Sequence, residues 1–176
     1  MAATKHTLVA LVEDRPGVLN RVASLFRRRG FNIQSITVGH SETPGISRMT
    51  IVADGTNTSV EQVRKQLDKL VETIKVSDIT AEDRVERELA LIKVKTTSAT
   101  RSDIIQIVDI FRANIVDVST DSLTVEVTGD ENKMDSLLNL LQGFGIKEVC
   151  RTGKIAMTRG IAGSTESGRK LPAEEE

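Results

Sequence analysis

A chain of 176 residues with a formal net charge of −1 has room for one ordinary domain or two small ones. Hydrophobic residues make up 39% and charged residues 28%, a balance that supports a packed core and argues against wholesale disorder. The near-neutral charge excludes an electrostatic case for nucleic acid or anionic membrane, and the only aromatic residues available for stacking on bases are four Phe.

The compartment is indicated by what the chain lacks. Cys150 is the single cysteine, so an internal disulfide framework is impossible. The first residues carry no apolar signal segment, and no apolar run approaches the length needed to span a membrane. We therefore expect a cytoplasmic protein with no membrane contact.

The first half follows one order of elements. Short apolar runs of strand length alternate with stripes of apolar residues at helical spacing. The predicted strands are His6–Val12, Phe31–Gly39, Ile46–Ala53 and Ile74–Ile79, and the predicted helices are Val18–Arg29 and Val60–Val71. The order is β-α-β-β-α-β, with Gly30 ending the first helix.

The second half repeats this order after the charge-rich segment Thr80–Glu88. Phe26-Arg27 followed by Asn32-Ile33 is echoed by Phe111-Arg112 followed by Asn114-Ile115. The predicted strands are Leu89–Val94, Asn114–Val118, Leu123–Val127 and Ile146–Met157, and the predicted helices are Ile104–Phe111 and Met134–Leu141.

The fold class predicted is α+β, with two tandem ferredoxin-like βαββαβ sandwiches. We place the first domain at residues 5–80 and the second at 81–160. Residues 161–176 are small, polar and charged, and we expect a disordered tail there.

The most informative segment is Glu13–Leu19, which joins a strand end to a helix start. Free backbone N–H groups at a helix N-terminus favour an anion such as a carboxylate. Gly17 allows close approach to the backbone, and Asp14 can accept a hydrogen bond from an ammonium group. The segment therefore suits a free amino acid. The alternative is an ordinary helix start, with Asp14 as its cap and Pro16 in its first turn.

The second informative segment begins at Asn32, which opens a strand expected at a sheet edge. An edge strand is a template for pairing with a second chain. If two copies pair there, Asn32 of one copy can face the Asp14–Gly17 loop of the other. The alternative is that Asn32 only serves the turn after Gly30.

Catalytic chemistry is not indicated. The chain shows no Cys or His spacing typical of a metal site and no phosphate-binding glycine loop followed by Lys-Ser or Lys-Thr. Its carboxylates are scattered over polar faces. We expect a protein that is not an enzyme.

A family resemblance adds to this interpretation. The string Asp14-Arg15-Pro16-Gly17-Val18-Leu19 resembles the signature of the ACT domain, a regulatory module that binds small molecules. Four further segments are similar to the regulatory subunit of acetohydroxyacid (acetolactate) synthase: Arg28–Ile36, Ser47–Ile51, Arg87–Val94 and Phe111–Val118. The resemblance covers roughly residues 5 to 160, and it makes the N-terminal domain an ACT domain.

The resemblance implies a function. Such subunits pair through their ACT domains, bind valine, leucine or isoleucine at that interface, activate a catalytic subunit and confer feedback inhibition on it. Thiamine diphosphate, magnesium and FAD belong to the catalytic partner, so no cofactor or metal is expected in this chain. The implied ligand contacts are Asp14, Pro16, Gly17, Val18 and Leu19 of one chain facing Asn32 and Ile33 of the other. Some family members carry Asn where Asp14 stands, which can tune affinity or pH dependence.

Three rivals remain on the same fold class. An ACT-type sensor acting on a different enzyme is the alternative function. An acylphosphatase-like hydrolase needs a glycine-rich phosphate loop with an arginine, which the chain does not show. An RNA-recognition module needs aromatic-rich strands, and these are also missing.

Overall fold

The computed structural model describes residues 4–55 and 57–160. Two compact units form within the chain. The first unit runs to Val85 and takes in the chain again from Ala156, and the second is Glu86–Ile155. We expect the boundary between residues 80 and 81 from the sequence, whereas the compact first unit continues to Val85, and Ile79 packs on the first sheet. The tail predicted at 161–176 lies outside the described residues.

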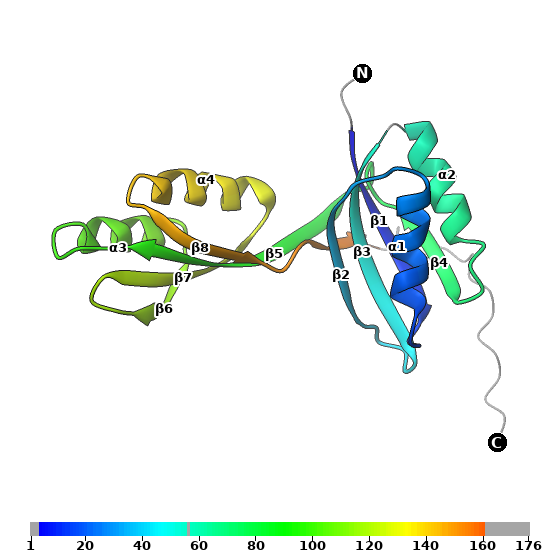
Figure 1. Cartoon of the computed structure of the whole chain (residues 1–176), viewed down its shortest axis with the longest axis horizontal. Helices are drawn as coiled ribbons and strands as arrows, with labels where there is room; N and C mark the ends of the chain where they lie inside the picture. Colours follow the sequence, from blue (N-terminus) through cyan, green and yellow to red (C-terminus); the bar gives the residue numbers. More distant parts are fainter. Residues whose placement is uncertain (1–3, 56, 161–176) are drawn as a thin grey trace. The chain divides into compact units, whose positions relative to one another are not determined.

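The first unit is a sheet with two helices on one face (Figure 1). Its strand order is β2-β3-β1-β4, and every neighbouring pair is antiparallel. The elements are β1 (Thr4–Glu13), α1 (Val18–Arg28), β2 (Ile33–His40), β3 (Ile46–Gly55), α2 (Asn57–Leu67) and β4 (Thr73–Asp78).

The core of this unit follows from alternation in the strands. Successive strand side chains point to opposite faces, so Leu8, Ala10 and Val12 meet the helices. The apolar stripe of α1 packs against them through Val22 and Phe26. Burying one such side chain contributes roughly 1.5–3 kcal/mol, so the helical layer is fixed over this face.

The second unit repeats the arrangement, with two helices over a sheet of order β6-β7-β5-β8 (Figure 1). The elements are β5 (Arg84–Lys95), α3 (Arg101–Ile110), β6 (Asn114–Val118), β7 (Ser122–Gly129), α4 (Glu131–Gln142) and β8 (Ile146–Arg151). The two orders are equivalent strand for strand. The predicted fold class, two tandem ferredoxin-like sandwiches, is therefore confirmed.

The last strand region, predicted over 146–157, forms two strands. It breaks after Arg151, and β9 (Ile155–Thr158) pairs with β5. The break contains Gly153, whose φ of 87° lies in the left-handed region that glycine adopts without a steric cost. From Ala156 the chain belongs to the first unit.

The returning chain covers the first sheet on the face that turns away from the helices. Val9 points to this face and forms a small apolar cluster with Ile79 and Ala156. Thr50 and Val52 point the same way and are only 3% and 2% exposed. The first sheet is therefore buried on both faces, one under helices and one under residues 79–84 with β9. In the parts of the chain that the structure describes, no helix has the length and apolarity to span a bilayer.

Candidate functional site

The connection between β1 and α1 is a tight turn. The Asp14 N–H donates to the Gly45 carbonyl at 2.8 Å, which holds the end of β1 against the β2–β3 hairpin. The Val18 N–H donates to the Arg15 carbonyl at 3.4 Å across Pro16 and Gly17. Gly17 has φ 88° and ψ −12°. Proline followed by a left-handed glycine is the signature of a type II turn.

Position 17 requires glycine because of its backbone conformation and not because neighbouring atoms crowd it. Its positive φ is strained for any residue with a side chain, at roughly 1–2 kcal/mol. A Cβ atom built at this position would meet no heavy atom within 4 Å. The space in front of the backbone is therefore open to a ligand.

Helix α1 begins without a side-chain cap. Gly17 is its N-cap residue, and no side chain accepts a hydrogen bond from the first turn. The first helical bond runs from the Arg21 N–H to the Gly17 carbonyl at 3.1 Å. The alternative interpretation, with Asp14 as cap and Pro16 in the first helical turn, is therefore wrong, because Pro16 precedes the N-cap. N–H groups in the first turn have no intrahelical acceptor, and together with the helix dipole they favour a bound anion.

Asp14 faces the end of β2 instead. Its Oδ2 lies 3.2 Å from Nδ1 of His40, the last residue of that strand. Both side chains are exposed, so the pair is accessible to solvent and worth little by itself. No sequence pattern indicates this contact. It arises because β1 and β2 both pair antiparallel with β3, which brings their carboxyl ends together.

Asn32 and Ile33 lie at the opposite end of the sheet. Ile33 pairs with Ala53, which pairs with His6 near the start of β1. About seven residues of strand separate this level from the loop, roughly 20 Å at about 3.3 Å per residue. One chain therefore gathers five of the predicted contacts in its loop and holds the other two far away. Asn32 is exposed, and its carbonyl accepts a hydrogen bond from the Asp54 N–H at 3.3 Å.

The edge of the first sheet is β2, as predicted. In the sheet that the structure describes, β2 pairs with β3 alone and stands at the end of the strand order. Val38 on this edge strand is 46% exposed, and Leu19 in the first turn of α1 is 47% exposed. Val38 pairs with the core residue Met49, so it points to the helix-covered face. This edge strand therefore presents apolar surface to solvent.

Comparison with known proteins decides the family. The family model described as "AHAS small subunit-like ACT domain" matches residues 8–75, and the one described as "Small subunit of acetolactate synthase" matches residues 87–160. A probable acetolactate synthase small subunit from Archaeoglobus fulgidus is 60% identical over 156 residues, 89% of this chain and 98% of that protein. The acetolactate synthase small subunit from Bacillus subtilis is 48% identical over 169 residues, 95% of this chain and 98% of that one.

This chain belongs to the acetolactate synthase small-subunit family. The crystal structure of the small subunit from Thermotoga maritima is similar in fold, with a TM-score of 0.82 and 46% identity over 89% of this chain and 98% of that one. The resemblance stated from the sequence is thus confirmed. Every residue of the predicted site lies inside the region that matches the ACT-domain model.

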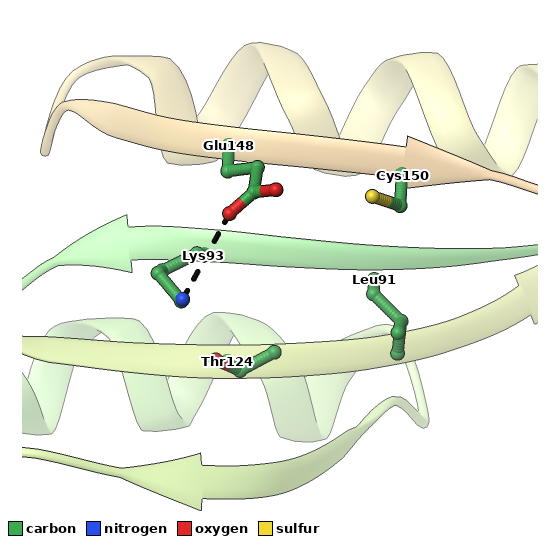
Figure 2. Close-up of a pocket in the computed structure, with 5 residues that line it drawn as sticks. All are labelled: Leu91, Lys93, Thr124, Glu148 and Cys150. Atoms are coloured by element: carbon green, nitrogen blue, oxygen red, sulfur yellow. Dashed lines mark ion pairs between the residues drawn. The ribbon is translucent and has the colours of Figure 1, made fainter.

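The second half of this small-subunit chain carries a different feature, a shallow depression of about 170 Å³ on the sheet face opposite its helices (Figure 2). Its lining is Leu91, Lys93, Thr124, Glu148 and Cys150. The Lys93 Nζ lies 3.8 Å from the Glu148 Oε2, and the Cys150 thiol is exposed. Sequence reasoning missed the depression because its residues come from three strands that no motif connects. Among residues 4–55 and 57–160, no group of three or more His, Cys, Asp or Glu is placed to hold a metal ion.

Proposed function

We propose that this chain is the regulatory subunit of an acetolactate synthase, that it binds a branched-chain amino acid, and that it confers feedback inhibition on a separate catalytic subunit. The observation that carries the proposal is the uncapped N-terminus of α1 behind Gly17. The relatives are named acetolactate synthase small subunits, and a small subunit requires a catalytic one. Thiamine diphosphate, magnesium and FAD are assigned to that partner, and the complex to the cytoplasm.

The ligand site is proposed to span two copies of the chain. If the β2 edges of two chains pair antiparallel, the start of one β2 lies beside the end of the other. Asn32 and Ile33 of one copy then come next to the Asp14–Leu19 loop of its partner. Within one chain the loop and Asn32 are roughly 20 Å apart, about seven strand residues. In the paired chains, the antiparallel β2 strands place the Asn32 end of one copy beside the loop end of the other. The pairing also covers the exposed Leu19 and Val38.

The polar ends of the ligand have separate anchors in this site. The carboxylate meets the free N–H groups of the first turn of α1, beside Gly17 and Pro16. The ammonium group meets Asp14 of the same loop and the Asn32 amide of the other copy. Val18 is buried, so it contributes its backbone, while Leu19 and Ile33 contribute apolar surface. Valine, leucine and isoleucine differ by at most about one methylene, so we expect selectivity of only about 1–3 kcal/mol among them.

The experiment that tests the proposal is calorimetric titration of the purified chain with valine, leucine, isoleucine and isovalerate. We expect the three amino acids to bind and isovalerate, which lacks the ammonium group, to bind far more weakly, because its absence leaves buried polar partners unpaired. Acetolactate formation by the chain mixed with a catalytic subunit should then fall as valine is added. Equal binding of isovalerate and valine contradicts the polar anchors. Amino-acid binding without any effect on acetolactate synthase points instead to a sensor of a different enzyme.

A further inference from the structure

Arg48 lies on β3 and points away from the helices. Its neighbour Met49 belongs to the core under α1 and α2, and alternation along the strand places Arg48 on the opposite face. There the Arg48 Nη2 donates a hydrogen bond to the Ala156 carbonyl at 3.0 Å. The side chain is half-buried, so this bond is made largely out of water.

Ala156 marks the point at which the chain returns from the second unit to the first. It is 5% exposed and packs with Val9 and Ile79 over the first sheet. A few residues later the Arg159 N–H donates to the Asp83 carbonyl at 2.8 Å. The returning segment is therefore fixed at both ends, and Arg48 supplies a bond from the sheet itself.

The other end of this connection is the proposed ligand site. In the register of the sheet, Arg48 pairs with Leu11 on one side and Gly39 on the other, close to the carboxyl ends of β1 and β2. The loop that carries Asp14 is bonded to Gly45 in the same hairpin that begins β3. Arg48 thus lies a few strand residues from the loop that carries Asp14. Its side chain is hydrogen-bonded to the returning chain.

Because the Arg48 guanidinium is a partly buried charge, the loss of its hydrogen bond to Ala156 is costly. Burial lowers the pKa of its guanidinium, and the nearby carboxylate of Glu42 acts in the opposite direction. A partly buried charge needs hydrogen-bond acceptors, because losing one leaves the cation poorly solvated. A movement of the hairpin that shifts Arg48 must therefore move Ala156 with it or break a costly bond.

We propose that Arg48 is a positioning residue that couples the ligand-loop end of the first sheet to the strand returning from the second unit, so that effector binding is transmitted to the second half of the chain. The proposal rests on the proposed function, because it assumes an effector at the loop. In this proposal Arg48 acts through the returning chain and not by contact with the ligand or the catalytic partner. It relates the occupancy of one site to the placement of a segment more than a hundred residues away, as the sequence separation of 108 shows.

The test uses the full chain in a reconstituted complex, with three variants. Arg48→Gln removes the charge, Arg48→Lys keeps it, and Arg159→Gln removes an exposed arginine from the same returning segment as a matched control. For Arg48→Gln we expect valine affinity within about twofold of wild type by calorimetry, and a tenfold or greater rise in the valine concentration that gives half inhibition. Arg48→Lys should restore part of the response, and Arg159→Gln should behave as wild type.

Hydrogen exchange supplies a measurement that needs no effector. The backbone amides of Ile155–Thr158 should exchange at least about tenfold faster in Arg48→Gln than in wild type or Arg159→Gln, because the local opening becomes easier. Wild-type inhibition and exchange in Arg48→Gln overturn the proposal. So does a loss of inhibition that only follows a loss of valine affinity, or an equal loss in Arg159→Gln. If Arg48→Gln does not fold, Arg48→Lys decides: a wild-type response and wild-type exchange in it overturn the proposal, and a partial loss supports it.

The two proposals fail in different ways. A wild-type chain that binds no branched-chain amino acid removes the proposed function and the coupling with it. A wild-type chain that binds valine and is inhibited normally, beside an Arg48→Gln variant that does the same, removes only the role of Arg48.

Discussion

The two strand-to-helix connections at the start of each repeat hold the same place in the fold and are built differently. In the first, Gly17 is the left-handed N-cap of α1, and no side chain caps the helix. In the second, Thr100 is the N-cap of α3 in a right-handed conformation, and here too no side chain caps the helix. The hydroxyl of Thr97 accepts from the Thr100 N–H at 3.3 Å, and the hydroxyl of Thr100 accepts from the Thr97 N–H at 3.0 Å.

In the second connection, an arginine of the first helical turn is hydrogen-bonded to backbone carbonyls of the neighbouring hairpin. The Arg101 Nη2 donates to the carbonyls of Ser119 and Thr120 at 2.8 and 3.0 Å, which ties the helix start to the neighbouring hairpin. In the first connection Asp14 pairs with the exposed His40 at the end of β2 instead. Under the proposed function the ligand chemistry belongs to one copy of the duplicated fold, and the difference lies in turn residues and not in topology.

The two repeats also differ in that the returning chain covers the first sheet on the face away from its helices. Removing this cover should have the largest effect, a loss of stability. A chain ending at Val85 loses β9 and with it the contact of Ala156 with Val9, while Ile79 stays on this face. We expect a loss of up to roughly 3–6 kcal/mol in the free energy of unfolding, the value for full exposure of Val9 and Val52 at roughly 1.5–3 kcal/mol each. Denaturant unfolding measures it, with a chain ending at Gly160 as the reference. Equal stability of the two chains would show that the cover contributes nothing.

Gly17→Asp should be next in size. The new side chain is strained at φ 88° and places a negative charge beside the proposed carboxylate position. We expect valine affinity to fall by about a hundredfold or more, about 2.7 kcal/mol. Thr100→Asp makes the matching change at the N-cap of α3 and should leave valine affinity unchanged. Calorimetry on both variants decides, and a similar loss in both would mean that the two connections are functionally alike.

Valine itself should stabilise the chain. A ligand that binds only the folded state adds roughly 2.7 kcal/mol at about 100 times its dissociation constant. For a chain of this size that raises the melting temperature by about 5–10 °C. Calorimetric melting with and without valine measures the shift. The Gly17→Asp variant provides the control, because it should show little or no shift at the same valine concentration.

Asn32→Ala tests whether the edge of the first sheet completes the site. Loss of a buried polar contact costs about 1–3 kcal/mol, which is roughly five- to two-hundred-fold in valine affinity. Asn114 opens the equivalent edge strand β6 in the second repeat, so Asn114→Ala is the matched control. Inhibition of acetolactate formation across a valine titration should shift for the first variant only, with stimulation of the catalytic subunit retained. An unchanged curve for Asn32→Ala would place the site elsewhere.

The smallest effect concerns the surface of α2. The guanidinium of Arg64, bonded to both oxygens of Glu61, lowers the pKa of that carboxyl to about 2. A lowered folded-state pKa means that the contribution is present above pH 4.5 and is lost as the pH falls toward 2. The pair is exposed, so Glu61→Gln should cost only about 0.3–0.5 kcal/mol at pH 7 and nothing near pH 2. Unfolding curves at the two pH values measure this, and a constant difference would contradict it.

Most of the fold could be predicted because its signals are local. The alternation of apolar residues in β1 predicts which face of the strand is buried. The apolar stripe of Val22, Leu25 and Phe26 does the same for α1, and Gly30 predicts where this helix ends. The edge position of β2 follows from the element order, since this topology has one standard strand order. The loop at Gly17 also carries a local signal, a Pro-Gly pair before an apolar stripe, and the anion site at this loop stays a prediction.

What could not be predicted depends on pairings between distant residues. The partner of Asp14 is His40, which comes near only through the shared strand β3. The cover on the first sheet needs Ala156 to meet Val9, and the apolar pattern of Ile155–Thr158 says that the segment is a strand without saying which sheet face it lies on. From the sequence, Arg48 is only a polar residue in a strand. Its hydrogen bond to the Ala156 carbonyl is visible only in the structure.

The return of the chain at Ala156 also sets an order of events during synthesis. Domains generally fold as units, the N-terminal one first as the chain emerges. Here the second unit is continuous, whereas the first is interrupted and lacks β9 until the whole of the second has been made. The nascent first sheet therefore has one finished face under its helices and one apolar face that waits for residues more than seventy positions further on, as the separation between Ile79 and Ala156 shows. The part of the molecule that begins first is the part that is completed last.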